Sequence, residues 1–89
     1  MKTKKGFVLR SLGDEFVLVA EGAEVYQTGR MVSMNESAAL LWQEVEGKDF
    51  DLNRLADLLV DHYGISHEVA EQDAGILLQT WKKAGIVEE

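Results

Sequence analysis

Two histidines, His62 and His67, are the residues whose types and spacing come closest to a chemical site. Together with Asp61 or Glu68 they offer the nitrogen and oxygen ligands that zinc accepts. The simpler interpretation, which we expect, is two surface histidines on either side of a helix–helix turn. The chain has no cysteine, no nucleophile motif, no phosphate-binding glycine pattern and no H-E-x-x-H sequence. We therefore predict no metal, no cofactor and no catalytic residues, with a metal-dependent enzyme as the minor alternative.

Two residues near the carboxyl end, Asp73 and Gly75, are unusual for a helix. Asp73 lies one turn from both Val69 and Leu77, on or beside an apolar stripe. An unpaired buried carboxylate is costly, so we expect the Asp73 carboxylate to accept a hydrogen bond that fixes the helix to a neighbouring segment. Contact with a partner molecule is the alternative. Glycine inside a helix costs roughly 1 kcal/mol relative to alanine, and Gly75 therefore suggests the close approach of another element or of a ligand.

The amino-terminal third of the chain predicts strands. Runs of β-branched and aromatic residues at 7–12 and 15–19 flank Gly13-Asp14, a two-residue turn signal, and indicate a β-hairpin. Residues 20–30 are mixed and predict a loop. Residues 31–34 then predict a third strand, which is short enough to lie at a sheet edge.

From residue 35 onward the apolar residues follow a helical period, which predicts three helices. Each helix is bracketed by a capping residue and a glycine stop: Asn35 and Gly47, Asp51 and Gly64, Ser66 and Gly85. The expected inward faces are Ala38, Leu41, Trp42 and Val45; Leu52, Leu55, Ala56, Leu59 and Tyr63; and Val69, Ile76, Leu77, Trp81 and Ala84. Strands followed by helices predict an α+β fold, a three-stranded antiparallel sheet followed by a three-helix bundle.

Composition limits the class of protein. A chain of 89 residues is expected to form a single domain, and its 46% hydrophobic and 28% charged residues are typical of a globular one. The lack of cysteine suits a reducing cytoplasm, and no apolar run approaches the roughly 20 residues that span a membrane. The first five residues contain three lysines, and we expect them to form a flexible, solvated basic tail.

Charge is unevenly distributed along the chain. Residues 1–35 hold five basic and four acidic side chains, a net charge of +1, whereas residues 36–89 hold four basic and twelve acidic side chains, a net charge of −8. Nucleic-acid binding depends largely on Lys and Arg neutralising phosphates. The acidic second part therefore argues against a nucleic-acid partner.

A series of short motifs runs through the second half of the chain in a fixed order. It consists of Met34-Asn35, the run Ala38-Ala39-Leu40-Leu41-Trp42, Gly47, Asp73, and finally Gly85 with Ile86. In this order and spacing the chain resembles the PqqD-like family, small proteins related to the pyrroloquinoline quinone biosynthesis chaperone and to precursor-peptide recognition elements. Met34, Leu77 and Trp81 stand where the family has Leu, Phe and Leu, which are apolar exchanges that change the shape of a groove and hence the preferred peptide.

The resemblance implies a winged-helix-like peptide adaptor. A leader peptide of a ribosomally made precursor would add as a strand to the sheet edge, between the third strand and the third helix. A radical SAM or other peptide-modifying enzyme would then do the chemistry, as in PQQ biosynthesis. The implied peptide-binding residues are Met31, Val32, Ser33, Met34, Asp73, Ile76, Leu77, Thr80 and Trp81.

Two alternatives concern other partners. A winged-helix DNA-binding regulator has the same succession of elements, but residues 67–84 carry three acids and two lysines, with no Arg or Asn to read bases. An exposed edge strand also invites pairing between two copies, so a homodimer is the second alternative.

Overall fold

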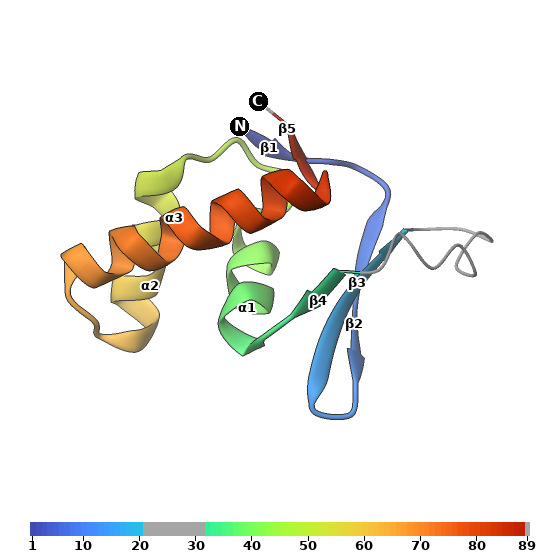
Figure 1. Cartoon of the computed structure of the whole chain (residues 1–89), viewed down its shortest axis with the longest axis horizontal. Coiled ribbons are helices and arrows are strands. Elements are labelled where there is room, and N and C mark those ends of the chain that lie inside the picture. Colours follow the sequence, from blue (N-terminus) through green and yellow to red (C-terminus); the bar gives the residue numbers. More distant parts are fainter. Residues whose placement is uncertain (21–31, 89) are drawn as a thin grey trace.

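The computed structural model describes residues 1–20 and 32–88. β2 (Phe7–Leu12) and β3 (Glu15–Ala20) form the predicted hairpin, and β4 (Val32–Met34) pairs with β3 to give the antiparallel order β2-β3-β4 (Figure 1). Gly13 opens the hairpin loop with a φ of +62°, a backbone region that favours glycine. The loop predicted at 20–30 is wrong at Ala20, which ends β3. The rest of that loop, and Met31 of the predicted third strand, lie outside the described residues.

The three predicted helices are confirmed as α1 (Glu36–Val45), α2 (Leu52–Tyr63) and α3 (His67–Ala84). In each, the predicted cap accepts a backbone N–H bond: Asn35 from Ala38 at 2.8 Å, Asp51 from Arg54 at 2.9 Å, and Ser66 from Val69 at 3.3 Å. Gly64 and Gly85 end α2 and α3 in the left-handed conformation. The predicted α+β class, a three-stranded antiparallel sheet followed by three helices, is therefore confirmed.

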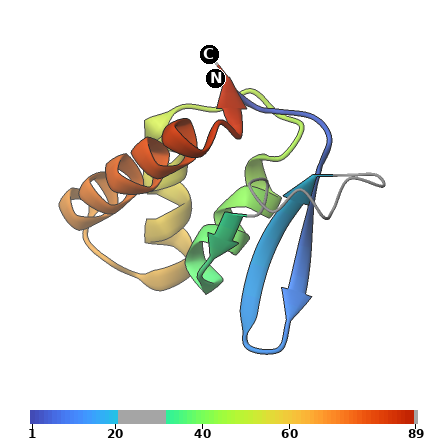
Figure 2. The same ribbon diagram turned by 45° about the vertical axis from the view of Figure 1, so that its right-hand side comes forward.

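The core lies where the helices meet one another and one face of the sheet (Figures 1 and 2). Trp42 of α1 and Trp81 of α3 are almost fully buried, and their rings meet edge to face with centroids 5.3 Å apart. Phe50, in the link between α1 and α2, also meets the Trp81 ring edge to face, with centroids 6.4 Å apart. Leu18 of the central strand is fully buried in the same cluster, so the sheet and the helices share one core.

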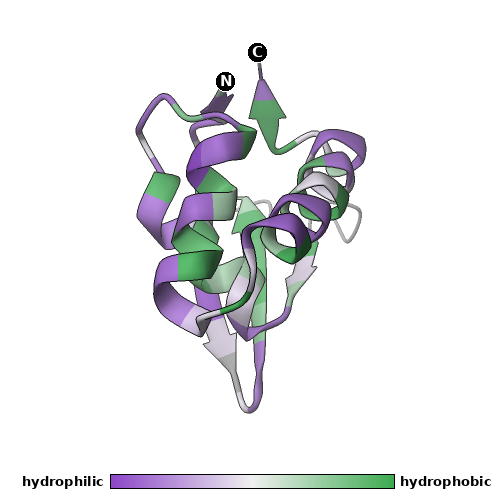
Figure 3. Cartoon of the chain, turned by 90° about the vertical axis from the view of Figure 1, so that its left-hand side faces the viewer, coloured by the Kyte–Doolittle hydropathy of each residue, from purple (hydrophilic) through white to green (hydrophobic). Residues whose placement is uncertain are grey.

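The predicted inward face of α3 is confirmed for Trp81, and Leu77 packs partly buried against the core, but the prediction is wrong for Val69, Ile76 and Ala84. The buried side chains of α3 are Ala70, Ala74, Leu78 and Trp81. Val69 and Ile76 are 45% and 68% exposed, and Ala84 is exposed as well. The reason is that alanines one turn apart let α3 pack closely on α2, which places the larger apolar residues on a flank of the helix. In Figure 3 hydrophilic and hydrophobic positions alternate along the helices, as expected for helices buried on one side only.

The ends of the second helix are also less buried than expected. Leu52 and Tyr63 are 37% and 44% exposed, whereas Leu55, Ala56 and Leu59 are buried as predicted. These two residues occupy the first and last positions of α2, whereas its buried residues lie between them.

A second, two-stranded sheet was not predicted. β1 (Lys2–Thr3) pairs antiparallel with β5 (Val87–Glu88), so the expected flexible tail is wrong for these residues. Thr3 is 7% exposed, and its Oγ1 accepts the Gly47 N–H at 3.2 Å. This sheet ties the chain beyond α3 to the end of α1 and so fixes the carboxyl end of α3 relative to α1 (Figure 1).

The first residue is held against the start of α2. The Met1 carbonyl accepts the Phe50 N–H at 2.8 Å. A hydrogen bond from the Met1 ammonium group and the positive charge of that group hold the pKa of Asp49 below its ordinary value. The amino-terminal segment is thus part of the packed structure.

Candidate functional site

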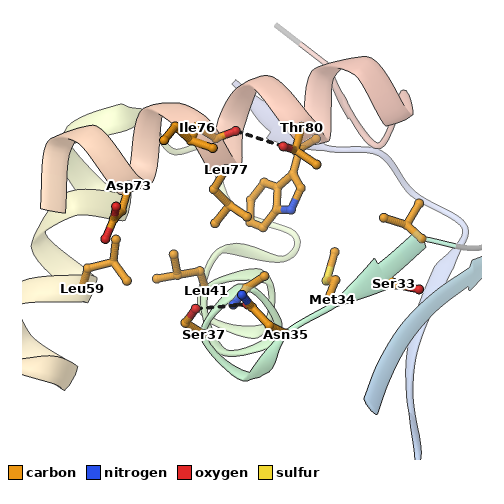
Figure 4. A pocket seen from close by; sticks show the side chains of 13 residues that line it. Ser33, Met34, Asn35, Ser37, Leu41, Leu59, Asp73, Ile76, Leu77 and Thr80 are labelled. Carbon is orange, nitrogen blue, oxygen red and sulfur yellow. Dashed lines mark hydrogen bonds between the residues drawn. The ribbon is translucent and has the colours of Figure 1, made fainter. Parts of the chain in front are cut away.

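A groove with a cavity volume of about 470 Å³ lies between β4 and α3, and α1 forms its floor (Figure 4). We call it the α3–β4 groove. That volume is within the usual range for a ligand pocket and can hold several side chains of a peptide. It is lined by Val32, Ser33, Met34, Asn35, Ser37, Ala38, Leu41, Leu59, Asp73, Ile76, Leu77, Thr80 and Trp81.

β4 supplies one wall and an open strand edge. Met34 is buried and Val32 is partly buried against the core, whereas Ser33 between them is exposed, which is the alternation of a half-buried strand. Within the described residues β4 pairs with β3 alone, in the register Phe16 opposite Met34 and Leu18 opposite Val32. Alternate residues of β4 therefore direct their backbone N–H and C=O groups away from the sheet, where a further strand can bind.

One flank of α3 forms the opposite wall of the groove. Leu77 points from α3 toward Leu41 of α1 in Figure 4. Trp81 also lines the groove and is almost fully buried. Ile76 is 68% exposed, a large apolar side chain that the fold leaves in water at the edge of the groove. The Thr80 hydroxyl donates to the Ile76 carbonyl at 3.1 Å, which leaves its oxygen lone pairs available to accept.

The floor of the groove was not predicted from the sequence. It comes from the first turns of α1, namely Asn35, Ser37, Ala38 and Leu41, and from Leu59 of α2. The signal that was available is the small Ala38 at the start of a helix that directly follows the edge strand, since a small side chain leaves room above it. Asn35 Oδ1 accepts both the Ala38 N–H and the Ser37 hydroxyl, so the turn that joins β4 to α1 is fixed.

The structure brings eight of the nine predicted peptide-binding residues to this one groove, and Met31 lies outside the described residues. They come from two segments that are some forty residues apart in the chain, β4 and the middle of α3. That these residues bind a peptide stays a prediction.

The prediction that Asp73 accepts a hydrogen bond from a neighbouring segment is wrong. Its side chain is exposed, and within residues 1–20 and 32–88 its carboxylate has no hydrogen-bond or ion-pair partner. The carboxylate extends from α3 into the groove on the side of Leu59 (Figure 4). The physical reason is the rotated inward face of α3, which places Asp73 on the groove flank of the helix and out of the core.

The expected close approach to Gly75 is also wrong for the described part of the chain. A Cβ atom added there would meet no heavy atom within 4 Å. Gly75 is two residues from Asp73 on the helix, a rotation of about 200°, so it faces away from the groove. The structure offers no physical reason for glycine at this position.

The two histidines do not form a metal site in the part of the chain that the structure describes. No group of three or more His, Asp or Glu side chains lies close enough there to hold an ion. Both histidines are exposed, and His67 lies 3.3 Å from Glu71 and 3.8 Å from Asp57. His67 thus contacts one carboxylate of its own helix and one of α2.

The fold and the groove together define a class, the small winged-helix-like α+β domain in which an open strand edge faces a helix across a groove lined by apolar and polar residues. The chain belongs to the PqqD family: residues 15–87 match the family described as coenzyme PQQ synthesis protein D. The family resemblance of the sequence motifs is therefore confirmed. Comparison with curated proteins gave no match.

Two solved structures share this fold. One is described as TbiB1 in complex with the TbiA(beta) leader peptide, with a TM-score of 0.73 and 22% identity over 99% of this chain and 95% of the other. The second is described as lasso peptide synthetase B1 complexed with the leader peptide, with a TM-score of 0.71 and 19% identity over 99% and 96%. At these identities the likeness concerns the fold. In the described ranges, none of the helices has the length and apolar character that crossing a membrane requires.

Proposed function

We propose that this chain is a non-catalytic adaptor that binds the leader of a ribosomally made precursor peptide and presents it to a maturation enzyme. The observation that carries the proposal is the α3–β4 groove, in which the open edge of β4 faces exposed apolar and polar side chains of α3. Membership of the PqqD family and the leader peptides named for both similar structures support it.

The mechanism follows from the two walls of the groove. An extended peptide pairs with β4 through backbone hydrogen bonds, which supply affinity whatever its sequence. Every second side chain of that peptide points into the groove, where Met34, Leu77 and Ile76 offer apolar contacts. The leader should therefore have apolar residues at alternate positions over a short stretch.

The chemistry belongs to a partner enzyme in this proposal. A radical SAM enzyme is the partner that the family resemblance suggests, and another peptide-modifying enzyme would use the adaptor in the same way. The adaptor increases the local concentration of the precursor at that enzyme and needs no catalytic residue for the purpose.

A display selection with random short peptides on the immobilised domain tests the proposal. Selected peptides should carry apolar residues at alternate positions, and Ile76→Ala should weaken their binding. Size-exclusion chromatography of the domain with and without a selected peptide tests whether a second copy of the chain occupies the groove instead. A peptide that binds at the β4 edge would dissociate such a dimer. A selection that returns no binder, or binders indifferent to Ile76, contradicts the proposal.

A further inference from the structure

Among the thirteen described residues that line the α3–β4 groove, Asp73 is the only one with an ionisable side chain. Its neighbours along the groove are Leu59, Ile76 and Leu77, all apolar. The carboxylate has no partner among the described residues, so the fold gains no hydrogen bond from it. A charge at this point of an apolar groove therefore has no structural role within the described chain.

The carboxylate does have a consequence for any peptide that enters the groove. A peptide lying along α3 removes water from Asp73, and a carboxylate that loses water without gaining a hydrogen-bond donor is costly. A Lys or Arg side chain supplies both donors and opposite charge, and charge-assisted hydrogen bonds are the stronger kind. The net charge of −8 in residues 36–89 favours the approach of the same basic peptide over longer distances.

We propose, building on the function proposed above, that the groove selects a leader with a Lys or Arg at one fixed position, where its side chain pairs with Asp73. The recognised element is then a basic residue joined to a stretch with alternate apolar residues. Asp73 acts as a specificity-determining residue in this proposal.

The geometry also gives the order of the basic residue and the apolar stretch along the leader. Figure 4 shows the order Ser33, Met34, Asn35 in the same direction as the order Thr80, Ile76, Asp73. Residue numbers rise in the first series and fall in the second, so β4 and α3 run antiparallel along the groove. A peptide that extends the sheet in its antiparallel pattern would have its amino end near Asp73. The basic residue therefore precedes the apolar stretch.

The spacing follows from the rise of the helix. Asp73 and Thr80 are seven residues apart on α3, which corresponds to about 10 Å along the helix. An extended peptide covers that distance in about three residues. Because side chains that face the groove are an even number of positions apart, we expect the basic side chain two or four positions before the apolar side chain that lies beside Thr80.

The test is a display selection with random short peptides on four domains: wild type, Asp73→Asn, Asp73→Lys and the control Asp61→Asn. Asp61 is an exposed acid on α2 that does not line the groove, so its substitution removes the same charge elsewhere. Wild type and Asp61→Asn should enrich Lys or Arg at one position before the apolar stretch. Asp73→Asn should lose this enrichment, and Asp73→Lys should enrich Asp or Glu at that position.

Titration of the best wild-type peptide gives the size of the effect. Asp73→Asn should weaken its binding about tenfold, and Asp61→Asn should leave it unchanged. Rising salt should weaken binding to wild type more than to Asp73→Asn. Unfolding of all variants at the same denaturant concentration would show that the fold is intact.

The experiment distinguishes failure of the proposed Asp73 role from failure of the proposed adaptor function. Peptides that require Ile76 but carry no basic preference overturn the role of Asp73 and leave the adaptor function standing. A domain that selects no peptide, or a dimer that no peptide dissociates, overturns both.

Discussion

Substitution of Ile76 should affect peptide affinity much more than the stability of the fold. Because 68% of its side chain is exposed, Ile76→Ala should change the free energy of unfolding by no more than about 0.5 kcal/mol. The same substitution removes an apolar contact from the groove and should weaken peptide binding about tenfold, as one or two buried methylene groups would. Denaturant unfolding and peptide titration measure the two effects.

Val69→Ala is the matched control for that prediction. Val69 is also an exposed apolar residue of α3, but it does not line the groove. Its substitution should leave both stability and peptide affinity nearly unchanged. Equal losses of affinity in the two variants would mean that binding does not involve the groove.

Gly75 is a position at which a substitution should raise the stability of the domain. Its backbone is helical and an added Cβ meets no heavy atom within 4 Å, so Gly75→Ala should stabilise the domain by about 0.5–1 kcal/mol. Gly64→Ala, at a φ of +65°, should instead destabilise it, because an alanine is strained there. Thermal melting compares the two; a destabilised Gly75→Ala would reveal a packing contact at this face of α3.

At the scale of the elements, the turn between β4 and α1 connects the stability of a helix to the shape of the groove. Asn35→Ala removes the acceptor of the 2.8 Å bond from the Ala38 N–H and should cost about 1 kcal/mol of stability. Because Asn35 also lines the groove at the end of β4, peptide affinity should fall as well.

Ser66→Ala provides the comparison, since it removes the equivalent cap of α3 far from the groove. It should lower stability to a similar degree without changing affinity. If both variants lose affinity equally, the loss reflects general instability of the domain.

The helices were predictable because their ends depend on local chemistry. Asn35, Asp51 and Ser66 accept the first backbone N–H bonds. Left-handed glycines end α2 and α3, and one follows the last turn of α1 at Gly47. The β1–β5 sheet was not predictable, because its strands have two residues each and are joined by long-range pairing between the chain ends. No local signal in Lys2 or Thr3 distinguishes such a strand from a tail.

The groove was predictable in outline and not in detail. The open edge strand and the middle of α3 were expected from the family resemblance, and both line it. The core face of α3 was misplaced because Val69 and Ile76 have stronger apolar character than Ala70 and Ala74, while close packing against α2 requires the smaller pair. Which apolar face becomes a groove depends on the neighbouring helix, and a single-helix pattern does not contain that information.

At the scale of the whole molecule, charge distinguishes the adaptor from a DNA-binding winged helix. Residues 36–89 carry a net charge of −8, and α3 exposes Glu68, Glu71 and Asp73. We expect no sequence-dependent binding of duplex DNA at physiological salt, since phosphates would be repelled. An electrophoretic mobility assay checks this, and a salt-sensitive shift specific to one sequence would support the regulator alternative.

The central claim is that an extended peptide pairs with β4 and lies against α3. Its most direct test is a titration of the ¹⁵N-labelled domain with a selected peptide while the backbone amide shifts are followed by NMR. The largest shifts should fall on residues 32–34 and on α3 between Asp73 and Thr80, the two walls of the α3–β4 groove. Shifts confined to the hairpin of residues 7–20, or to the turn around His62 and His67, would contradict it.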